Sequence, residues 1–109
     1  MASEMAADVP TSNEVDVGML LSPKRGAILL AAQEAANELS RAKTLWPRPY
    51  VNAHEGFAVL LEEVDELKAH VWTNQKKRDL EAMRKEAVQV AAMALRFIVE
   101  VCDEGRGRE

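Results

Sequence analysis

Cysteine and aromatic residues are scarce in this sequence of 109 residues. Cys102 is the only cysteine, which excludes a disulfide within the chain, and its apolar neighbours Ile98, Val99 and Val101 predict a buried, unreactive thiol. Phe, Trp and Tyr together supply 5% of the residues. Ala, Leu, Val, Glu and Lys dominate the central and C-terminal segments instead, a mixture typical of helical proteins.

Long apolar runs and a positive net charge are also missing. No apolar run approaches the roughly 18 residues that cross a bilayer, and the N-terminus lacks the basic and apolar regions of a signal peptide. We therefore expect a soluble cytoplasmic protein without a membrane partner. The formal net charge of −4 argues against binding to a nucleic acid polymer, which requires a basic surface. A nucleotide ligand is compatible with this charge, because a metal ion can supply the positive charge.

Turn-forming residues divide the sequence into three predicted helices. Residues 1–21 have no sustained apolar period and predict a flexible arm. Ser22 and Pro23 are typical of a helix start, as N-cap and first helical residue, for a first helix that ends at about residue 43. Pro47 and Pro49 cannot continue a helix, so a connector follows.

Asn52 predicts the start of the second helix, with Glu55 in the position of its capping-box partner. This helix ends near residue 72, and a polar, basic connector leads to a third helix from about residue 79 to residue 103. Residues 105–109 predict a disordered tail. Residues 22–104 therefore form one predicted all-α domain.

The predicted core follows one apolar stripe on each of the two long helices. These stripes comprise Phe57, Leu60, Leu61, Val64, Leu67 and Val71 on the second helix, and Leu80, Met83, Ala87, Val90, Ala91, Ala94, Leu95, Ile98 and Cys102 on the third. Met93 and Phe97 lie off the stripe and predict a second buried contact, either a subunit interface or the floor of a base pocket. We favour the interface, because three helices alone cannot cover two faces. The predicted fold is a three-helix bundle completed by oligomerisation, as a homodimer or homotetramer.

Acidic residues flank these stripes. Glu63 and Glu66 are three residues apart on the second helix, as are Glu86 and Gln89 on the third, so each pair shares one helix face. Two antiparallel helices with a short loop can bring the pairs together across a cleft between them. Carboxylate oxygens bind hard cations, above all Mg²⁺, usually with substrate phosphates. The spacing alone is equally typical of a solvated acidic face. A bound cation, however, would relieve the repulsion among these crowded like charges.

Two segments together resemble the MazG-like all-α nucleotide pyrophosphohydrolases, over about residues 25–103. The family's first motif, Glu-Glu-x-x-Glu, is matched by Glu62, Glu63 and Glu66. Its second motif, Glu-x-x-Asp, is matched by Glu86, which follows Glu66 after nineteen residues. The chain departs from the family at Gln89, which replaces the motif's final Asp by an uncharged amide.

The resemblance implies a Mg²⁺-dependent hydrolase, with Mn²⁺ as a substitute ion, that converts a nucleoside triphosphate and water to a monophosphate and pyrophosphate. Such an enzyme could clear unwanted nucleotides from the cell. Glu63, Glu66, Glu86 and Gln89 would be the metal ligands. Glu62 would support the ligands or position the attacking water as a base, and the four glutamates would be the catalytic residues.

Basic and aromatic residues near the two motifs are candidates for contacts with the substrate. These candidates are Lys76, Lys77, Arg78, Arg84, Lys85, His54 and Trp72, with Trp46 and Tyr50 as further residues that could stack on or bond to a base. Solvated loops, a helix start at His54 and packing of Trp72 are the alternative interpretations. Two alternative functions also stand: a catalytically weak protein that binds nucleotides or a partner, to which Gln89 points, and a purely structural helical oligomer.

Overall fold

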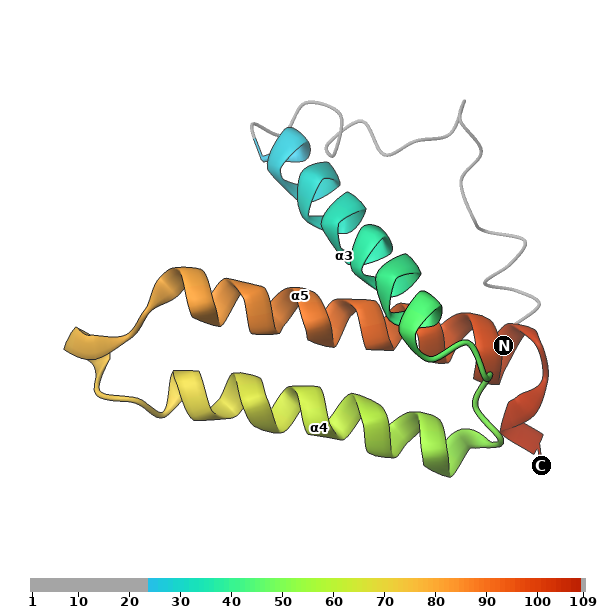
Figure 1. The fold of residues 1–109 in the computed structure, drawn as a ribbon. Coiled ribbons are helices and arrows are strands. Elements are labelled where there is room, and N and C mark those ends of the chain that lie inside the picture. The colour runs from blue at the N-terminus through green and yellow to red at the C-terminus, as the bar shows by residue number, and fades with distance from the viewer. Residues whose placement is uncertain (1–23, 109) are drawn as a thin grey trace. The chain divides into compact units, whose positions relative to one another are not determined.

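The computed structural model describes residues 24–108, and every regular element among them is helical. In chain order these elements are α3 (Arg25–Leu45), α4 (Ala53–Val71), η1 (Gln75–Lys77), α5 (Leu80–Arg96), η2 (Phe97–Asp103) and η3 (Arg106–Arg108), and Figure 1 traces them along the chain. The predicted all-α class is confirmed for this part of the chain. The predicted arm at residues 1–21 and helix start at Ser22 and Pro23 lie outside the described residues.

The chain divides into two compact units, Met1–Leu30 and Ala31–Glu109. Of the first unit the structure describes residues 24–30, which enter α3. The remainder of α3 and all later elements belong to the second unit, which contains the candidate site. No helix in the described part of the chain is both long and apolar enough to cross a membrane.

The start of α4 is fixed by two side chains, as the sequence predicts. The Asn52 side chain accepts a hydrogen bond from the backbone N–H of Glu55 at 3.0 Å. The Glu55 carboxylate accepts one from the N–H of Val51 at 2.7 Å, one residue earlier than a capping box prescribes. Together these bonds set the direction in which the chain enters α4.

A hairpin joins α4 to α5, and the two helices run antiparallel alongside each other (Figure 1). The Asp79 side chain caps α5 by accepting a hydrogen bond from the N–H of Ala82 at 3.0 Å. Arg78 donates from Nε and Nη2 to the carbonyl oxygen of Val71 at 3.0 and 2.7 Å. That carbonyl belongs to the last turn of α4, where helix carbonyls lack intrahelical partners. Local contacts therefore hold the turn between the two helices that carry the acidic motifs.

The third predicted helix continues from α5 into η2, where the backbone widens to a π-helix. The N–H of Glu104 donates to the carbonyl of Val99 at 3.0 Å, a spacing of five residues instead of four. The prediction of a helix to residue 103 is confirmed, although its last turns are wider than expected. Two consecutive residues of this wider segment, Glu100 and Val101, are both buried.

The core of the second unit is small and lies between all three long helices. Ala42 of α3 packs with Ala92 and Met93 of α5. Three half-buried side chains pack against this cluster: Leu39, Val59 and Leu60. The small alanine side chains allow close approach of the helix backbones, which brings residues of α3 near the acidic faces of α4 and α5.

A second close contact lies at the first turn of α4. Gly56 is buried there, and a Cβ atom at this position would come within 3.0 Å of ring atoms of Tyr50 and Phe97 and within 3.1 Å of Val101. These distances are shorter than ordinary van der Waals contact. The absence of a side chain at Gly56 therefore lets the connector before α4 and the η2 segment meet at this helix.

Of the fifteen residues in the apolar stripes predicted as the core, eight are exposed and seven are half-buried. Phe57 on α4 is 57% exposed and Leu80 on α5 is 69% exposed. The other exposed members are Leu61, Val64, Ala87, Ala91, Ile98 and Cys102. The predicted intrachain burial of these residues, including the Cys102 thiol, is wrong. The buried core lies at the edge of the stripes, where Ala42, Ala92 and Met93 pack together and the stripe residue Leu60 packs against them.

The side of Met93 and Phe97 is covered by the chain itself. Met93 is buried in the intrachain core, contrary to the favoured prediction of a subunit interface, and it lines a cavity beside the acidic motifs. The alternative prediction, a pocket floor, fits this position.

Within the predicted disordered tail, residues 106–108 form the short turn η3, where Arg106 donates to the Tyr50 carbonyl oxygen at 3.3 Å.

Candidate functional site

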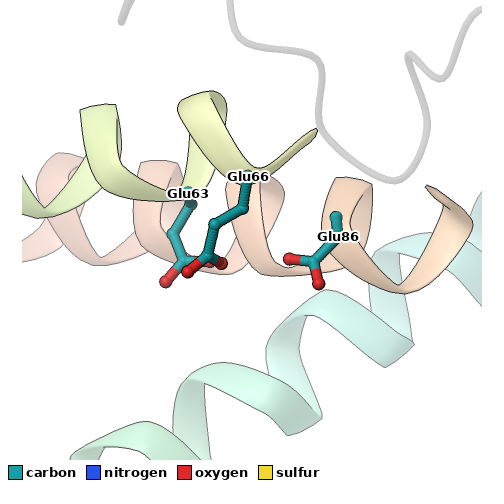
Figure 2. A group of neighbouring side chains, drawn as sticks. All are labelled: Glu63, Glu66 and Glu86. Atoms are coloured by element: carbon teal, nitrogen blue, oxygen red, sulfur yellow. The ribbon is translucent and has the colours of Figure 1, made fainter. Parts of the chain in front are cut away.

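Three carboxylates from α4 and α5 converge on one side of the helix hairpin (Figure 2). Glu63 and Glu66 project from adjacent turns of α4, and Glu86 approaches them from α5. One oxygen atom from each residue lies within 4.8 Å of those from the other two. The structure therefore brings together three of the four residues predicted as metal ligands, in a spacing that one hard cation can bridge.

The electrostatics of this cluster are unfavourable in the absence of a cation. Partial burial of Glu63, followed by the adjacent carboxylates of Glu66, Glu86 and Glu62, raises the pKa of Glu63 to about 7. Both causes disfavour the charged form of a carboxyl group. A divalent ion at this position would offset the repulsion and stabilise all three carboxylates in their ionised form.

The acidic cluster forms one end of a cavity of about 770 Å³. This volume lies within the range of sites for small molecules and cofactors, roughly 300–1,000 Å³. Glu62 and Gln89 also line the acidic end, and the remainder is lined by residues of α3, the connector and α5. Carboxylates at one end and apolar and aromatic side chains at the other give the two ends different chemistry.

The α3 helix contributes an acidic residue, Glu38, that the sequence analysis missed. Glu38 lines the cavity. Hydrogen bonds from Arg41 and then from the Gln89 amide, together with the nearby Lys85 ammonium, hold the pKa of Glu38 below its usual range. The position of Gln89 thus has a carboxylate close by, although that carboxylate belongs to a different helix. Glu38 lies four residues before the buried Ala42, and this spacing could have placed it on the inward face.

The connector between α3 and α4 forms the other end of the cavity. Trp46 lies at its rim and is 68% exposed, whereas Tyr50 is buried beneath it. Arg48 lines the same end and pairs with the Glu55 carboxylate at 2.9 Å. The side chains of Val59 and Met93 complete an apolar wall. Trp46 and Tyr50 therefore lie where a planar, partly apolar ligand group could pack against them.

Most of the basic residues predicted to contact substrate lie elsewhere. Lys85 lines the cavity. Lys76 and Lys77 lie in η1 at the hairpin bend, and Arg78 caps the end of α4. Arg84 donates from Nη1 and Nη2 to the two carboxylate oxygens of Glu34 at 2.6 and 2.7 Å, outside the cavity.

The two predicted aromatic contacts outside the connector are also remote from the cavity lining. His54 is exposed in the first turn of α4, in agreement with its interpretation as a helix-start residue. Trp72 is exposed at the C-terminal end of α4, with Lys68 Nζ 5.8 Å from its ring centre. Neither residue lines the 770 Å³ cavity.

No family model, curated protein or solved structure matches this chain. The resemblance to the pyrophosphohydrolase family therefore depends on the motifs themselves.

Proposed function

We propose that this protein is a Mg²⁺-dependent nucleotide pyrophosphohydrolase of the MazG-like type, which hydrolyses a nucleoside triphosphate to a monophosphate and pyrophosphate. The observation that carries the proposal is the convergence of Glu63, Glu66 and Glu86 at one end of a cavity that is aromatic at the other. Phosphates require cations, and a nucleobase requires a planar apolar surface. The acidic end offers carboxylate ligands for a cation that would bind the phosphates, and the aromatic end offers a surface for the base.

The donor set fits a hard divalent ion. Glu63, Glu66 and Glu86 would hold it through carboxylate oxygens, and the amide oxygen of Gln89 would complete the set. When bound, Mg²⁺ supplies the positive charge that offsets phosphate charge in the transition state. The raised pKa of Glu63 agrees with this assignment, because a carboxyl group that is costly to ionise alone gains most from a cation.

The chain's own residues would then orient the reactants. Glu62, exposed at the rim beside the ligands, would position the attacking water and accept its proton. The water oxygen bonds to the α-phosphorus, the bond from that phosphorus to the bridging oxygen breaks, and pyrophosphate leaves. Lys85 lies at the acidic end, where its ammonium group would face the departing phosphates. Trp46 would stack on the base and fix the opposite end of the substrate.

We further propose that a second copy of the chain covers the exposed stripes of α4 and α5. The stripe on α4 carries large side chains, including Phe57 and Leu61, whereas that on α5 carries the small side chains Ala87 and Ala91 between larger ends. Large side chains of one copy can pack into the shallow groove over the alanines of the other, as in a four-helix bundle. At about 100° per residue the α4 stripe lies on the far side from Glu66, so this assembly leaves the cavity open.

Measurement of the products tests the enzymatic proposal directly. A panel of ribo- and deoxynucleoside triphosphates is incubated with Mg²⁺ or Mn²⁺, and monophosphate and pyrophosphate are separated and quantified. We expect Glu66→Gln to abolish turnover, because it removes a charged ligand. Asp65→Asn, on the adjacent exposed position outside the cavity, is the matched control and should retain it. Equal turnover by Glu66→Gln and wild type, or release of orthophosphate alone, would contradict the proposal.

A second candidate function is favoured by Gln89, which lacks the charge of the family's Asp. In this alternative the cavity binds a nucleotide with a metal ion but turns it over weakly. A nucleotide-dependent rise in melting temperature that requires the metal, without release of pyrophosphate, would identify such a protein.

A further inference from the structure

A buried ion pair lies behind the aromatic end of the cavity and has no part in the proposed chemistry. Arg96 of α5 and Glu100 of η2 are 4% and 2% exposed, and Arg96 Nε donates to Glu100 Oε2 at 2.9 Å. Glu100 is the largest fully buried side chain in the described part of the chain. Burial of two charges costs free energy unless both are well paired, so the contacts of this pair indicate what it does.

Within the described residues, Glu100 Oε2 also lies 3.7 Å from Lys43 Nζ of α3, and the further hydrogen bonds of the pair run to the connector between α3 and α4. Arg96 Nη2 donates to the carbonyl oxygens of Trp46 and Arg48, each at 3.0 Å. Glu100 Oε1 accepts a hydrogen bond from the N–H of Tyr50 at 2.9 Å. The Arg96 guanidinium also lies 4.8 Å from the centre of the Tyr50 ring.

The sequence of the connector explains why it depends on these contacts. Pro47 and Pro49 have no backbone N–H to donate, and each disfavours helical backbone in the residue before it, Trp46 and Arg48. The connector therefore cannot form a regular hydrogen-bonded structure of its own. Arg96 supplies donors to the two carbonyls that precede the prolines, and Glu100 supplies an acceptor to the N–H that comes after them.

We propose that Arg96 and Glu100 are positioning residues that hold the Trp46–Tyr50 connector as the nucleoside-binding wall of the cavity. The pair thereby controls nucleotide affinity without contributing to metal affinity. Neither side chain belongs to the acidic cluster; Arg96 lines the cavity, whereas Glu100 does not. The identity of the ligand as a nucleotide rests on the proposed function. The contact between the pair and the connector is independent of that function.

The test uses Trp46 as the reporter of the connector. The chain has two tryptophans, so a Trp72→Phe background leaves Trp46 as the single tryptophan, which is excited selectively at a wavelength that tyrosine does not absorb. In this background we compare Arg96→Lys, which keeps the charge but loses the planar fork, and Glu100→Gln, which keeps the shape but loses the charge. Asp103→Asn is the matched control, since Asp103 is an exposed carboxylate at the end of the same η2 segment. Circular dichroism verifies folding of each variant.

Three measurements separate the roles. We expect both variants to lower the fluorescence anisotropy of Trp46 and to raise the nucleotide KM by about tenfold or more, because each loses hydrogen bonds to a charged group. The affinity for Mn²⁺ alone, from calorimetry, should remain that of the parent protein. Asp103→Asn should match the parent in all three measurements.

Several outcomes would overturn the proposal. Unchanged Trp46 anisotropy and KM in both variants would show that the pair does not hold the connector. If the variants lost Mn²⁺ affinity as much as nucleotide affinity, the pair would support the whole site and not only its nucleoside end. Failure of both conservative variants to fold would assign it to the fold alone. If the parent protein hydrolyses no nucleotide, the proposed function fails, and the anisotropy comparison still decides whether Arg96 and Glu100 position Trp46.

Discussion

A change of pH from 8 to 6 should weaken metal binding at the acidic cluster by an amount that the pKa of Glu63 sets. Burial and the neighbouring carboxylates raise this pKa to about 7. Glu63 is then about nine-tenths ionised at pH 8 and about one-tenth ionised at pH 6. Since a cation binds the carboxylate form, we expect the association constant for Mn²⁺ to fall roughly tenfold across this interval, and Mn²⁺ binding at pH 7 to release about half a proton.

The same shift predicts how the stability of the fold depends on pH. The pKa of Glu63 is higher in the folded state than its ordinary value of 4.5, so the folded protein binds this proton more tightly than the unfolded chain does. The stabilising contribution is complete below the unfolded pKa and is lost as the pH rises through about 7. A bound cation reverses this loss, and the metal-dependent rise in melting temperature should therefore be larger at pH 8 than at pH 6.

Isothermal titration calorimetry measures both quantities. Titration of MnCl₂ at pH 6, 7 and 8 gives the affinities, and repetition at pH 7 in two buffers with different ionisation enthalpies counts the released protons. Glu63→Gln is the control, because it removes the titrating group and should bind Mn²⁺ weakly with little pH dependence over this interval. Equal affinities at pH 6 and 8, with no proton released at pH 7, would refute the reasoning.

Three further perturbations test the geometry and the packing. Gln89→Asp adds a carboxylate beside the cluster and should tighten Mn²⁺ binding by on the order of a kcal/mol; unchanged or weaker binding in calorimetry would contradict the predicted position of residue 89 near the ion. Gly56→Ala should lower the free energy of unfolding in urea by roughly 1–3 kcal/mol, because its Cβ would meet three side chains. Gly26→Ala, where no atom lies within 4 Å of the added carbon, should not be destabilising. Leu61→Glu should convert the proposed oligomer to a folded monomer in light scattering, whereas a wild-type monomer at micromolar concentration would remove the proposed interface.

Local chemistry made the helices and their starts predictable. The side chains of Asn52 and Asp79 cap α4 and α5 through bonds to residues three positions ahead, and such signals depend only on neighbours in the sequence. The three-residue spacing of Glu63 and Glu66 likewise placed them on one face before any tertiary contact was known. The antiparallel arrangement of two adjacent helices then brought Glu86 to them.

The parts that could not be predicted depend on which face of a helix finds a partner. Apolar periodicity marks Leu61 and Ile98 as residues that avoid water, but it does not distinguish an intrachain core from the surface between two copies. Alanine carries little weight in such a pattern, yet Ala42 and Ala92 belong to the buried core cluster. The spacing to Ala42 can place Glu38 on an inward face, but the contacts of Glu38 with Gln89 and of Arg96 with the connector join residues about fifty positions apart, which no local rule predicts.

The different chemistry of the two cavity ends bears on the release of products. Under the proposed function, cleavage divides a ligand that was held at both ends into two products that are each held at one. Pyrophosphate would depend on the cation for its retention, whereas the monophosphate would keep its contacts with Trp46 and the apolar wall. The pyrophosphate would then bind only when metal is present, whereas the nucleoside monophosphate would still bind in the presence of a chelator.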